Sequence, residues 1–237
     1  MNKEEFIKEL KKINIDISDN QLEKLDKFKE LLKEYNQKFN LTTIIKDNDI
    51  YLKHFYDSLY LMTTKEFKNS SSILDIGVGA GFPSIPLAIL NEDKEFTLIE
   101  SSQKKCNFIN IVKEKLSLSN IIIINKRAED FTRLNREKFD LATSRAVSHL
   151  KNLSELEIPS LKTNGYFIPM KAEYEKELEE SKEILSKLKS KIINKYEYFL
   201  PIENSKRSIL VIQKLEKTNT LYPREYSKII KETKNIK

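Results

Sequence analysis

Three of the four glycines in this 237-residue chain lie within five residues, at Gly77, Gly79 and Gly81. The residues just before them, 73–76, read Ile-Leu-Asp-Ile and predict a short buried strand. Residues 83–90 follow them and begin with proline, which suits the first turn of a helix. This order of elements lets backbone N–H groups approach a nucleotide-like ligand. A turn alone needs one glycine, so three of them favour a ligand-binding loop.

The spacing of these glycines selects among ligand classes. In the dinucleotide-binding pattern G-x-G-x-x-G, the third glycine would fall where this chain has Phe82. The pattern here is D-x-G-x-G-x-G, beginning at Asp75, and it resembles the first motif of Rossmann-like methyltransferases that use S-adenosylmethionine. That cofactor carries an ammonium and a sulfonium but no phosphate, so a carboxylate beside the turn suits it. The spacing therefore disfavours an NAD-dependent oxidoreductase.

A second carboxylate strengthens this interpretation. Residues 95–100 predict the next strand, and the strand ends at Glu100. Glu100 lies 19 residues after Gly81, close to the spacing of about 20 expected for an acid that binds ribose hydroxyls. A solvated charge at a strand end is the alternative for Glu100 taken alone.

Composition narrows the class of protein further. The sequence shows no secretory signal and no apolar run long enough to span a bilayer, and its single cysteine, Cys106, excludes a disulfide framework. These features predict a cytoplasmic protein with no membrane partner. With only two histidines, His54 and His149, no metal site is expected.

The net charge of +6 is unevenly distributed. Residues 217–237 hold six basic and two acidic side chains, which predicts a basic tail suited to a polyanionic partner. The chain is rich in lysine, isoleucine and asparagine, as expected from an AT-rich genome. In such a background, the lysines of the tail could equally form a solvated face.

Hydrophobic periodicity predicts an α/β fold with an N-terminal helical extension. Helices are expected over residues 3–14, 18–39, 47–62, 83–91, 102–116, 148–159 and 173–191. Strands are expected over residues 72–76, 95–100, 120–125, 138–144, 163–170, 194–200 and 207–215. The alternation of strand and helix predicts a mostly parallel sheet with helices on both faces, a Rossmann-like methyltransferase core. We divide the chain into a helical cap (1–65), this core (66–216) and a basic tail (217–237).

Four blocks of sequence make the resemblance more specific. They are residues 35–42 (YNQKFNLT), 54–58 (HFYDS), 74–88 (LDIGVGAGFPSIPLA) and 143–146 (TSRA). In this order they resemble the bacterial ribosomal RNA small-subunit methyltransferase G family, also called glucose-inhibited division protein B. Shorter matches at 128–129, 169–171, 206–207 and 222–224 extend the resemblance over most of residues 20–225. One departure is Ser84, where the family commonly has glycine.

The resemblance implies an activity and a partner. Members of the family methylate N7 of one guanine in small-subunit (16S) ribosomal RNA, with S-adenosylmethionine as methyl donor. The partner would then be this RNA or the assembling small ribosomal subunit, bound by a monomeric enzyme. Guanine N7 already offers a lone pair, so catalysis consists mainly of positioning it in line with the methyl group. Amino-nitrogen methyltransferases often carry Asn/Asp-Pro-Pro-aromatic after the fourth strand, where this chain has Ser-Arg-Ala at 144–146.

The resemblance also assigns candidate site residues. The cofactor-binding candidates are Asp75, Gly77, Gly79, Gly81, Phe82, Glu100, Ala128, Glu129 and Arg145. Arg145 is the catalytic candidate, because a guanidinium at the end of the fourth strand could grip the methionine carboxylate or an RNA phosphate. The candidates for RNA phosphate contact are Lys104, Lys105, Lys171 and Arg207. His54 and Asp57 either line the mouth of the site or pack one helix against another.

Two other functions stay open from the sequence. One is a methyltransferase of the same fold that acts on a small molecule or a protein, which the basic tail disfavours. The other is a non-catalytic module that binds RNA or the ribosome, which would not need the intact motif from Asp75 to Gly81.

Overall fold

The computed structural model describes residues 1–145 and 147–233. Its strands are β1 (Ser72–Ile76), β2 (Glu95–Glu100), β3 (Ile121–Asn125), β4 (Phe139–Thr143), β5 (Leu161–Phe167), β6 (Met170–Lys171), β7 (Ser190–Phe199) and β8 (Lys206–Lys214). Its longer helices are α1 (Lys3–Lys12), α2 (Asp19–Phe39), α6 (Ser84–Leu90), α7 (Gln103–Lys115), α8 (Ala128–Leu134), α9 (Leu150–Glu157), α10 (Glu175–Lys187) and α11 (Tyr226–Lys231). Short helical segments are α3 (Asp47–Asp49), the π-helix η1 (Ile50–Tyr56), α4 (Asp57–Leu59), the 3₁₀ helices η2 (Tyr60–Thr63) and η3 (Ile158–Ser160), and α5 (Lys65–Lys68).

The strands form one eight-stranded sheet in the order β3-β2-β1-β4-β5-β8-β6, and β7 also pairs with β8. The first five of these run parallel, whereas β8 runs antiparallel to its neighbours. The chain leaves β1 toward β2 and β3 and then returns to β4 on the other side of β1. Ligands of doubly wound sheets bind at this reversal, beyond the carboxyl ends of the two central strands.

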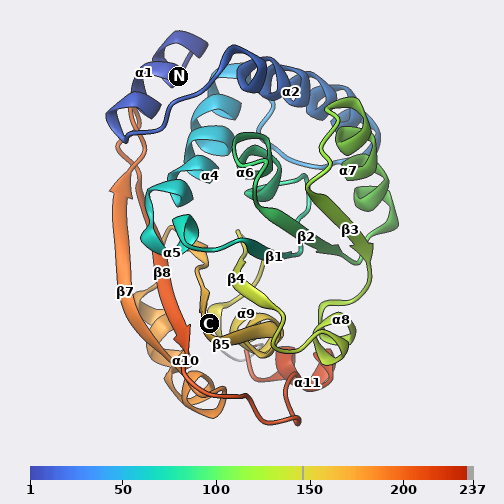
Figure 1. Ribbon diagram of the computed structural model, residues 1–237, viewed down its shortest axis with the longest axis vertical. Coiled ribbons are helices and arrows are strands. Elements are labelled where there is room, and N and C mark those ends of the chain that lie inside the picture. The colour runs from blue at the N-terminus through green and yellow to red at the C-terminus, as the bar shows by residue number, and fades with distance from the viewer. Residues whose placement is uncertain (146, 234–237) are drawn as a thin grey trace.

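Two hydrophobic clusters cover the two faces of the sheet. In β1, Ile73 packs into one cluster while Leu74 and Ile76 pack into the other, because alternate side chains of a strand point to opposite faces. The first cluster includes residues of α1, α2, η1, α6 and α7, and the second includes residues of α8, α9, α10 and α11. Figure 1 shows α2, α6 and α7 on one side of β1–β3 and α8, α9 and α11 on the other. The Rossmann-like architecture expected from the sequence is therefore present.

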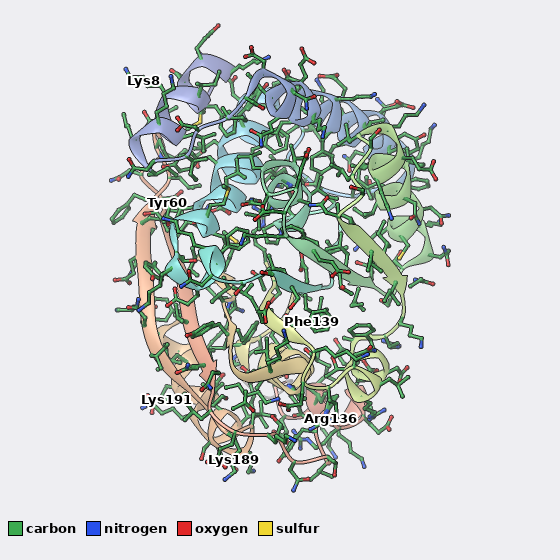
Figure 2. All side chains as sticks on the ribbon, viewed as in Figure 1. Lys8, Tyr60, Arg136, Phe139, Lys189 and Lys191 are labelled. Atoms are coloured by element: carbon green, nitrogen blue, oxygen red, sulfur yellow. The ribbon has the colours of Figure 1, made fainter. Side chains whose placement is uncertain are left out.

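The N-terminal helices share the core of the sheet. Phe28 of α2 stacks near Phe55 and Phe108, with ring centroids 5.9 and 6.4 Å away. Phe82, in the glycine-rich loop, packs against the same ring at 5.2 Å. The cap is thus continuous with the core in its packing, and the division at residue 65 stays a prediction. Figure 2 shows side chains filling the space between these layers, with Phe139 inside and Lys8, Lys189 and Lys191 at the periphery.

Three expectations of secondary structure need correction. The single helix expected over 47–62 is a succession of short segments, with the π-helix η1 at its centre. The helix expected to run to 191 ends earlier, because Lys189 adopts a left-handed conformation (φ 57°) and β7 begins at Ser190. The tail carries α11, which no periodicity in so short a segment predicts.

No helix within the described ranges is both long and apolar enough to cross a membrane.

Candidate functional site

The glycine-rich loop follows β1 at the reversal of the strand order. All three of its glycines have positive φ, at 73°, 58° and 99°. A Cβ on Gly81 would lie 2.6 Å from Cγ1 of Ile85, so this glycine is needed for packing. A Cβ on Gly79 would meet nothing closer than the carbonyl oxygen of Gly77, at 3.8 Å, because Gly79 faces a cavity. We call this cavity of about 380 Å³ the loop cavity; it is lined by residues 77–80, Phe82, Glu100 and Arg145 among others.

Glu100 fixes the shape of the loop from the end of β2. Its Oε2 accepts a hydrogen bond from the Gly79 N–H at 3.1 Å, and its Oε1 accepts one from the Ser102 N–H at 2.8 Å. The residue is 6% exposed and lines the loop cavity. A carboxylate held this firmly presents its remaining lone pairs in a fixed direction, as binding of ribose hydroxyls requires.

A smaller cavity of about 110 Å³ adjoins the loop cavity, and Gly77, Ser101 and Val147 line both. Ala128 and Glu129, predicted to lie near the cofactor, line this small cavity. Tyr226 of α11 also lines it, under the guanidinium of Arg127 at 5.6 Å from the ring centroid. Tyr226 was not predicted, because the only signal that the tail offers in the sequence is its positive charge.

Asp75 occupies a different place from the one expected. Its side chain is fully buried and lines neither of these two cavities, whereas a direct contact with the cofactor would need it at their surface. Its Oδ2 accepts a hydrogen bond from the Ser84 hydroxyl at 2.6 Å, and burial raises the pKa of Asp75 to about 8. Asp75 therefore joins the end of β1 to the start of α6 beneath the loop. Ser84, the first residue of α6, supplies the hydroxyl.

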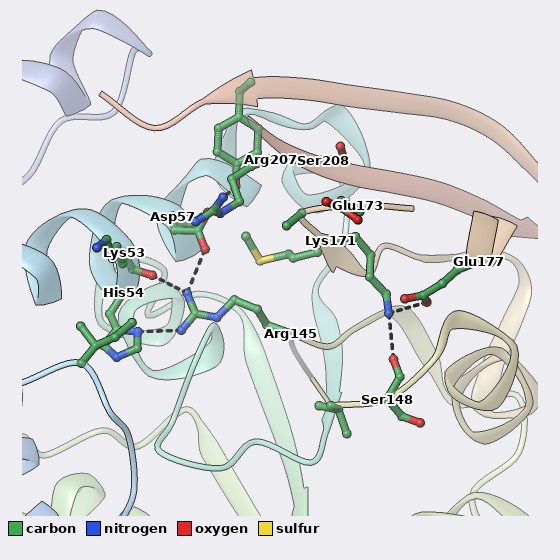
Figure 3. Close-up of a pocket in the computed structure, with 15 residues that line it drawn as sticks. Lys53, His54, Asp57, Arg145, Ser148, Lys171, Glu173, Glu177, Arg207 and Ser208 are labelled. Carbon is green, nitrogen blue, oxygen red and sulfur yellow. Dashed lines mark hydrogen bonds and ion pairs between the residues drawn. The ribbon is translucent and has the colours of Figure 1, made fainter. Parts of the chain in front are cut away.

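Arg145 is the centre of the polar contacts at the end of β4 (Figure 3). Its Nη1 donates to the Lys53 carbonyl at 2.9 Å and to Oδ2 of Asp57 at 3.0 Å. Its Nη2 lies 2.9 Å from Nδ1 of His54, and its guanidinium lies over the Phe82 ring at 5.1 Å. These bonds use three of the five N–H groups of a guanidinium, and the described residues leave the other two without a protein acceptor. Arg145 can therefore hold the protein together and still donate to a ligand.

His54 is a neutral side chain in this arrangement. Burial and the adjacent Arg145 charge lower the pKa of His54 to about 3. Since Nδ1 faces a guanidinium donor, it accepts, and Nε2 then carries the proton toward the Thr42 hydroxyl at 3.1 Å. The ring stacks on Phe82 with a centroid distance of 4.1 Å and an interplanar angle of 11°.

Asp57 connects this centre to the antiparallel end of the sheet. Its Oδ1 accepts a hydrogen bond from the Tyr198 hydroxyl at 2.7 Å and lies 3.7 Å from Nε of Arg207. Burial and the adjacent Asp57 charge raise the pKa of Tyr198 well above its ordinary value. The i, i+3 spacing of His54 and Asp57 predicts that they share one helix face. No local pattern in the sequence predicts that Tyr198 would meet them.

A large cavity of about 610 Å³ lies on the other side of Arg145. Arg145, His54 and Val147 line both this cavity and the loop cavity. The fifteen residues that line the large cavity come from η1, α4, β6–β8, α10 and their connections, as Figure 3 shows. Cavities that meet at one shared wall suit two ligands whose reacting atoms must approach each other.

The four bases predicted to contact RNA phosphates lie in different surroundings. Lys104 is exposed on α7, and Lys105 lines the loop cavity. Lys171 is not a free surface base: its Nζ donates to Glu177 and to the Ser148 carbonyl, both at 2.8 Å, and its side chain is only 10% exposed. Arg207 lines the large cavity beside Asp57. Lys171 and Arg207 thus line the large cavity together, whereas Lys105 lines the loop cavity.

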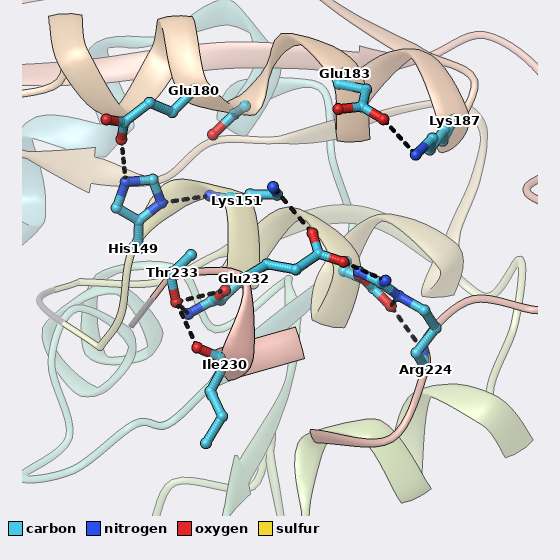
Figure 4. A network of polar contacts seen from close by, with 12 residues as sticks. His149, Lys151, Glu180, Glu183, Lys187, Arg224, Ile230, Glu232 and Thr233 are labelled. Atoms are coloured by element: carbon cyan, nitrogen blue, oxygen red, sulfur yellow. Dashed lines mark hydrogen bonds and ion pairs between the residues drawn. The ribbon is translucent and has the colours of Figure 1, made fainter. Parts of the chain in front are cut away.

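The tail is fastened to the body of the protein (Figure 4). Arg224 donates from Nε and Nη2 to the two oxygens of buried Glu155, at 2.9 and 2.7 Å, and from Nη1 to Glu232 at 2.5 Å. Lys151 also pairs with Glu232 at 2.9 Å. These pairs neutralise Arg224, so it is not available to a polyanion.

The other basic residues of the tail differ. Lys228 and Lys231 are exposed on α11, whereas Lys234 and Lys237 lie outside the described residues. Ala146, the last residue of the TSRA block, also lies outside them. Elsewhere in the described chain, no group of three or more His, Cys, Asp or Glu side chains is placed to hold a metal ion.

Comparison with known proteins identifies relatives over nearly the full chain. The family model described as rRNA small subunit methyltransferase G (GidB) matches residues 21–204. The protein named ribosomal RNA small subunit methyltransferase G from Fusobacterium nucleatum is 43% identical over 223 residues, which are 94% of this chain and 96% of the relative. The protein of the same name from Clostridium botulinum strain Alaska E43 is 40% identical over 92% of this chain and 93% of its own length.

Solved structures match in fold. An O-methyltransferase from Bacillus cereus, in complex with S-adenosylhomocysteine, aligns with a TM-score of 0.59 at 13% identity over 88% of this chain and 96% of its own. TYW2 from M. jannaschii, in complex with S-adenosylmethionine, aligns with a TM-score of 0.52 at 19% identity over 74% and 79% of the two chains. At these identities the likeness concerns the fold alone.

Proposed function

The chain belongs to the rRNA small subunit methyltransferase G family, and we propose that it transfers a methyl group from S-adenosylmethionine to N7 of a guanine in small-subunit ribosomal RNA. The observation that carries this proposal is the wall between the two larger cavities. Arg145, His54 and Val147 line both, so a cofactor in the loop cavity and a base in the large cavity would meet there.

The open space of the loop cavity and the hydrogen-bond acceptors that line it suit S-adenosylmethionine. Open space beside Gly79 leaves room for a ligand against the backbone, and Glu100 offers carboxylate oxygens to ribose hydroxyls. The small cavity extends this space past Ala128 and Glu129 to Tyr226, which suits a flat aromatic base. When bound, the cofactor supplies an electrophilic methyl group on its sulfonium. The nearest residues of this chain bind and orient it.

The residues at the wall position the reactants and do not remove a proton. His54 cannot act as a base, because its Nδ1 accepts from Arg145 and its pKa of about 3 keeps it neutral at physiological pH. Guanine N7 needs no base, since its lone pair is free to attack. Alignment of two bound reactants can lower a barrier by about 7–11 kcal/mol at best, which makes positioning the main catalytic contribution. We propose that the free N–H groups of Arg145 contribute to that positioning.

We further propose that the enzyme acts as a monomer in the bacterial cytoplasm, where small ribosomal subunits assemble.

The test compares ribosomal RNA from cells with and without the gene. Nuclease digestion and mass spectrometry should find one 7-methylguanosine in small-subunit RNA that is missing when the gene is deleted. Purified protein and S-adenosylmethionine should restore it on RNA or subunits from the deletion strain. Methylation of a protein or small molecule, with ribosomal RNA unchanged, would contradict the proposal. RNA binding without methyl transfer would show a non-catalytic module instead.

A further inference from the structure

Among the described residues, one carboxylate that lines the large cavity has no partner. Seven charged side chains line it, namely Lys53, Asp57, Arg145, Lys171, Glu173, Glu177 and Arg207. Lys53 pairs with Glu203 at 2.7 Å, and Lys171 pairs with Glu177 at 2.8 Å. Arg145 and Arg207 both face Asp57. Within residues 1–145 and 147–233, only Glu173 of the seven makes no hydrogen bond or ion pair, and it is exposed to the cavity.

A buried hydroxyl lies on the same side of the cavity. Ser208 is 1% exposed, lines the cavity and has no hydrogen-bond partner for its Oγ among the described residues. Ser208 of β8 pairs in register with Lys171 of β6, and Glu173 follows Lys171 by two residues. Figure 3 shows Glu173 and Ser208 together near β8, with Arg145 and His54 on another side of the cavity. Among the described residues, no protein group competes with a ligand for this hydroxyl.

This pair of groups matches one edge of one nucleobase. The Watson–Crick edge of guanine presents an acceptor, O6, and two donors, N1–H and the N2 amino group. A hydroxyl donor beside a carboxylate acceptor presents the complementary pattern. Adenine and the pyrimidines do not offer an acceptor followed by two donors. We propose that Ser208 and Glu173 bind the Watson–Crick edge of the target guanine, a proposal that rests on the function proposed above.

The same contact would orient the base for reaction. N7 lies beside O6 and on the opposite side of the purine from N2, so a base held by Glu173 through N1–H and the N2 amino group leaves N7 free to face the wall formed by Arg145 and His54. Methylation at N7 places a positive charge on the ring system and strengthens the N1–H donor. The hydrogen bond to Glu173 therefore becomes stronger as the methyl group transfers, which favours the transition state over the bound substrate.

The charge of Glu173 argues against a phosphate placed beside it. Lys53 and Lys171 each pair with a glutamate, Arg145 and Arg207 share Asp57, and Glu173 pairs with none of these four cations. A phosphate placed beside Glu173 would be repelled. A base that is neutral before the reaction and cationic after it suits the position beside Glu173.

The experiment replaces one exocyclic group of the substrate. Small-subunit RNA is prepared by splinted ligation with either guanine or inosine at the methylated position, and assembled into subunits where the enzyme requires them. Inosine keeps N7, O6 and N1–H but lacks the N2 amino group. We expect wild-type kcat/KM to be about tenfold or more higher for guanine, the loss typical of a hydrogen bond to a charged group. Glu173→Ala should reduce the guanine rate and bring the ratio close to one.

Two further variants complete the comparison. Ser208→Ala should lower the rates for guanine and inosine RNA by a similar factor, because both bases carry O6. Glu179→Ala changes an exposed carboxylate of α10 that pairs with Lys182 and does not line the large cavity, and it should leave both rates unchanged. A Glu173→Ala enzyme that still prefers guanine tenfold would overturn the assignment, although N7 methylation would stand. If wild-type enzyme methylates neither RNA, the proposed function fails, and this assignment fails with it.

Discussion

Nη2 of Arg145 lies 2.9 Å from Nδ1 of His54, and this contact joins the end of β4 to the π-helix of the N-terminal cap. The two residues are 91 positions apart in the chain, yet together they line both the loop cavity and the large cavity. The contact also determines which ring nitrogen of His54 carries the proton. The wall between the two cavities is therefore built jointly by the cap and the core.

The methylation rate of Arg145→Lys should be about 100-fold lower than that of wild type. A misplacement of about 1 Å at a reacting centre costs a factor of this size. A lysine ammonium cannot reach the Lys53 carbonyl, Asp57 and His54 with the geometry of a planar guanidinium. Thermal stability should also fall, because Asp57 and Arg145 are a nearly buried pair with 6% and 14% of their side chains exposed. Steady-state kinetics and thermal unfolding measure the two effects.

Arg133→Lys is the matched control for that variant. Arg133 pairs with Asp130 and Glu225 at the surface and lines none of the three cavities. It should keep wild-type turnover. Full methylation by Arg145→Lys would show that its contacts are purely structural.

The second and third glycines of the loop, Gly79 and Gly81, should respond differently to alanine. Gly79→Ala places a methyl group in the open space of the loop cavity and costs about 1–2 kcal/mol of stability from its left-handed conformation. Calorimetry should show that Gly79→Ala loses most of its affinity for S-adenosylhomocysteine. Gly81→Ala adds a contact of 2.6 Å with Ile85 and should lower the melting temperature much more. Equal loss of stability in both, with binding intact in Gly79→Ala, would contradict this division of roles.

Much of the fold was predictable because its signals are local. A strand of apolar residues, a cluster of glycines and an amphipathic helix each lie within a short window, and their order predicts the parallel sheet. The carboxyl ends of β1, β2 and β4 then bring Gly79, Glu100 and Arg145 to one edge of the sheet. The resemblance to the family supplied the candidate roles of Phe82, Ala128 and Glu129.

The rest depends on contacts between distant residues. Tyr198 reaches Asp57 across 141 positions through the antiparallel pairing of β7 with β8. Charge can be read from sequence, but the partner that neutralises it cannot: Lys171 was expected at the surface, and Glu177 holds it in the large cavity. Asp75 was expected to face the ligand because its position in the motif is local, whereas its burial depends on the helices packed around it.

Asp75→Asn should change how stability depends on pH. The pKa of Asp75 is raised from 3.8 to about 8, mainly by burial. Between these values the folded protein retains a proton that the unfolded chain releases, so rising pH favours unfolding across this window. Asparagine cannot ionise, so the variant should gain melting temperature relative to wild type as the pH rises from 4 toward 8.

Asp93→Asn, on the exposed turn before β2, provides the comparison for that experiment. Its melting temperature should follow that of wild type at every pH. A constant difference between Asp75→Asn and wild type from acid to neutral pH would show that Asp75 does not titrate in this window.

The last prediction separates two roles of the tail. Phosphate contacts weaken with salt through counterion release, by a slope of about 0.7–0.9 per contact. Lys228→Gln with Lys231→Gln removes two exposed charges from α11 and should flatten the salt dependence of RNA binding without changing affinity for S-adenosylhomocysteine. Tyr226→Ala should weaken binding of S-adenosylhomocysteine without changing the salt dependence of RNA binding, because Tyr226 lines the small cavity beside Ala128 and Glu129. Deletion of residues 226–237 should therefore both flatten the salt dependence of RNA binding and weaken binding of S-adenosylhomocysteine. An unchanged salt slope in the double variant would identify the two lysines as solvated bystanders and direct the search for phosphate contacts to Lys104 and Lys105.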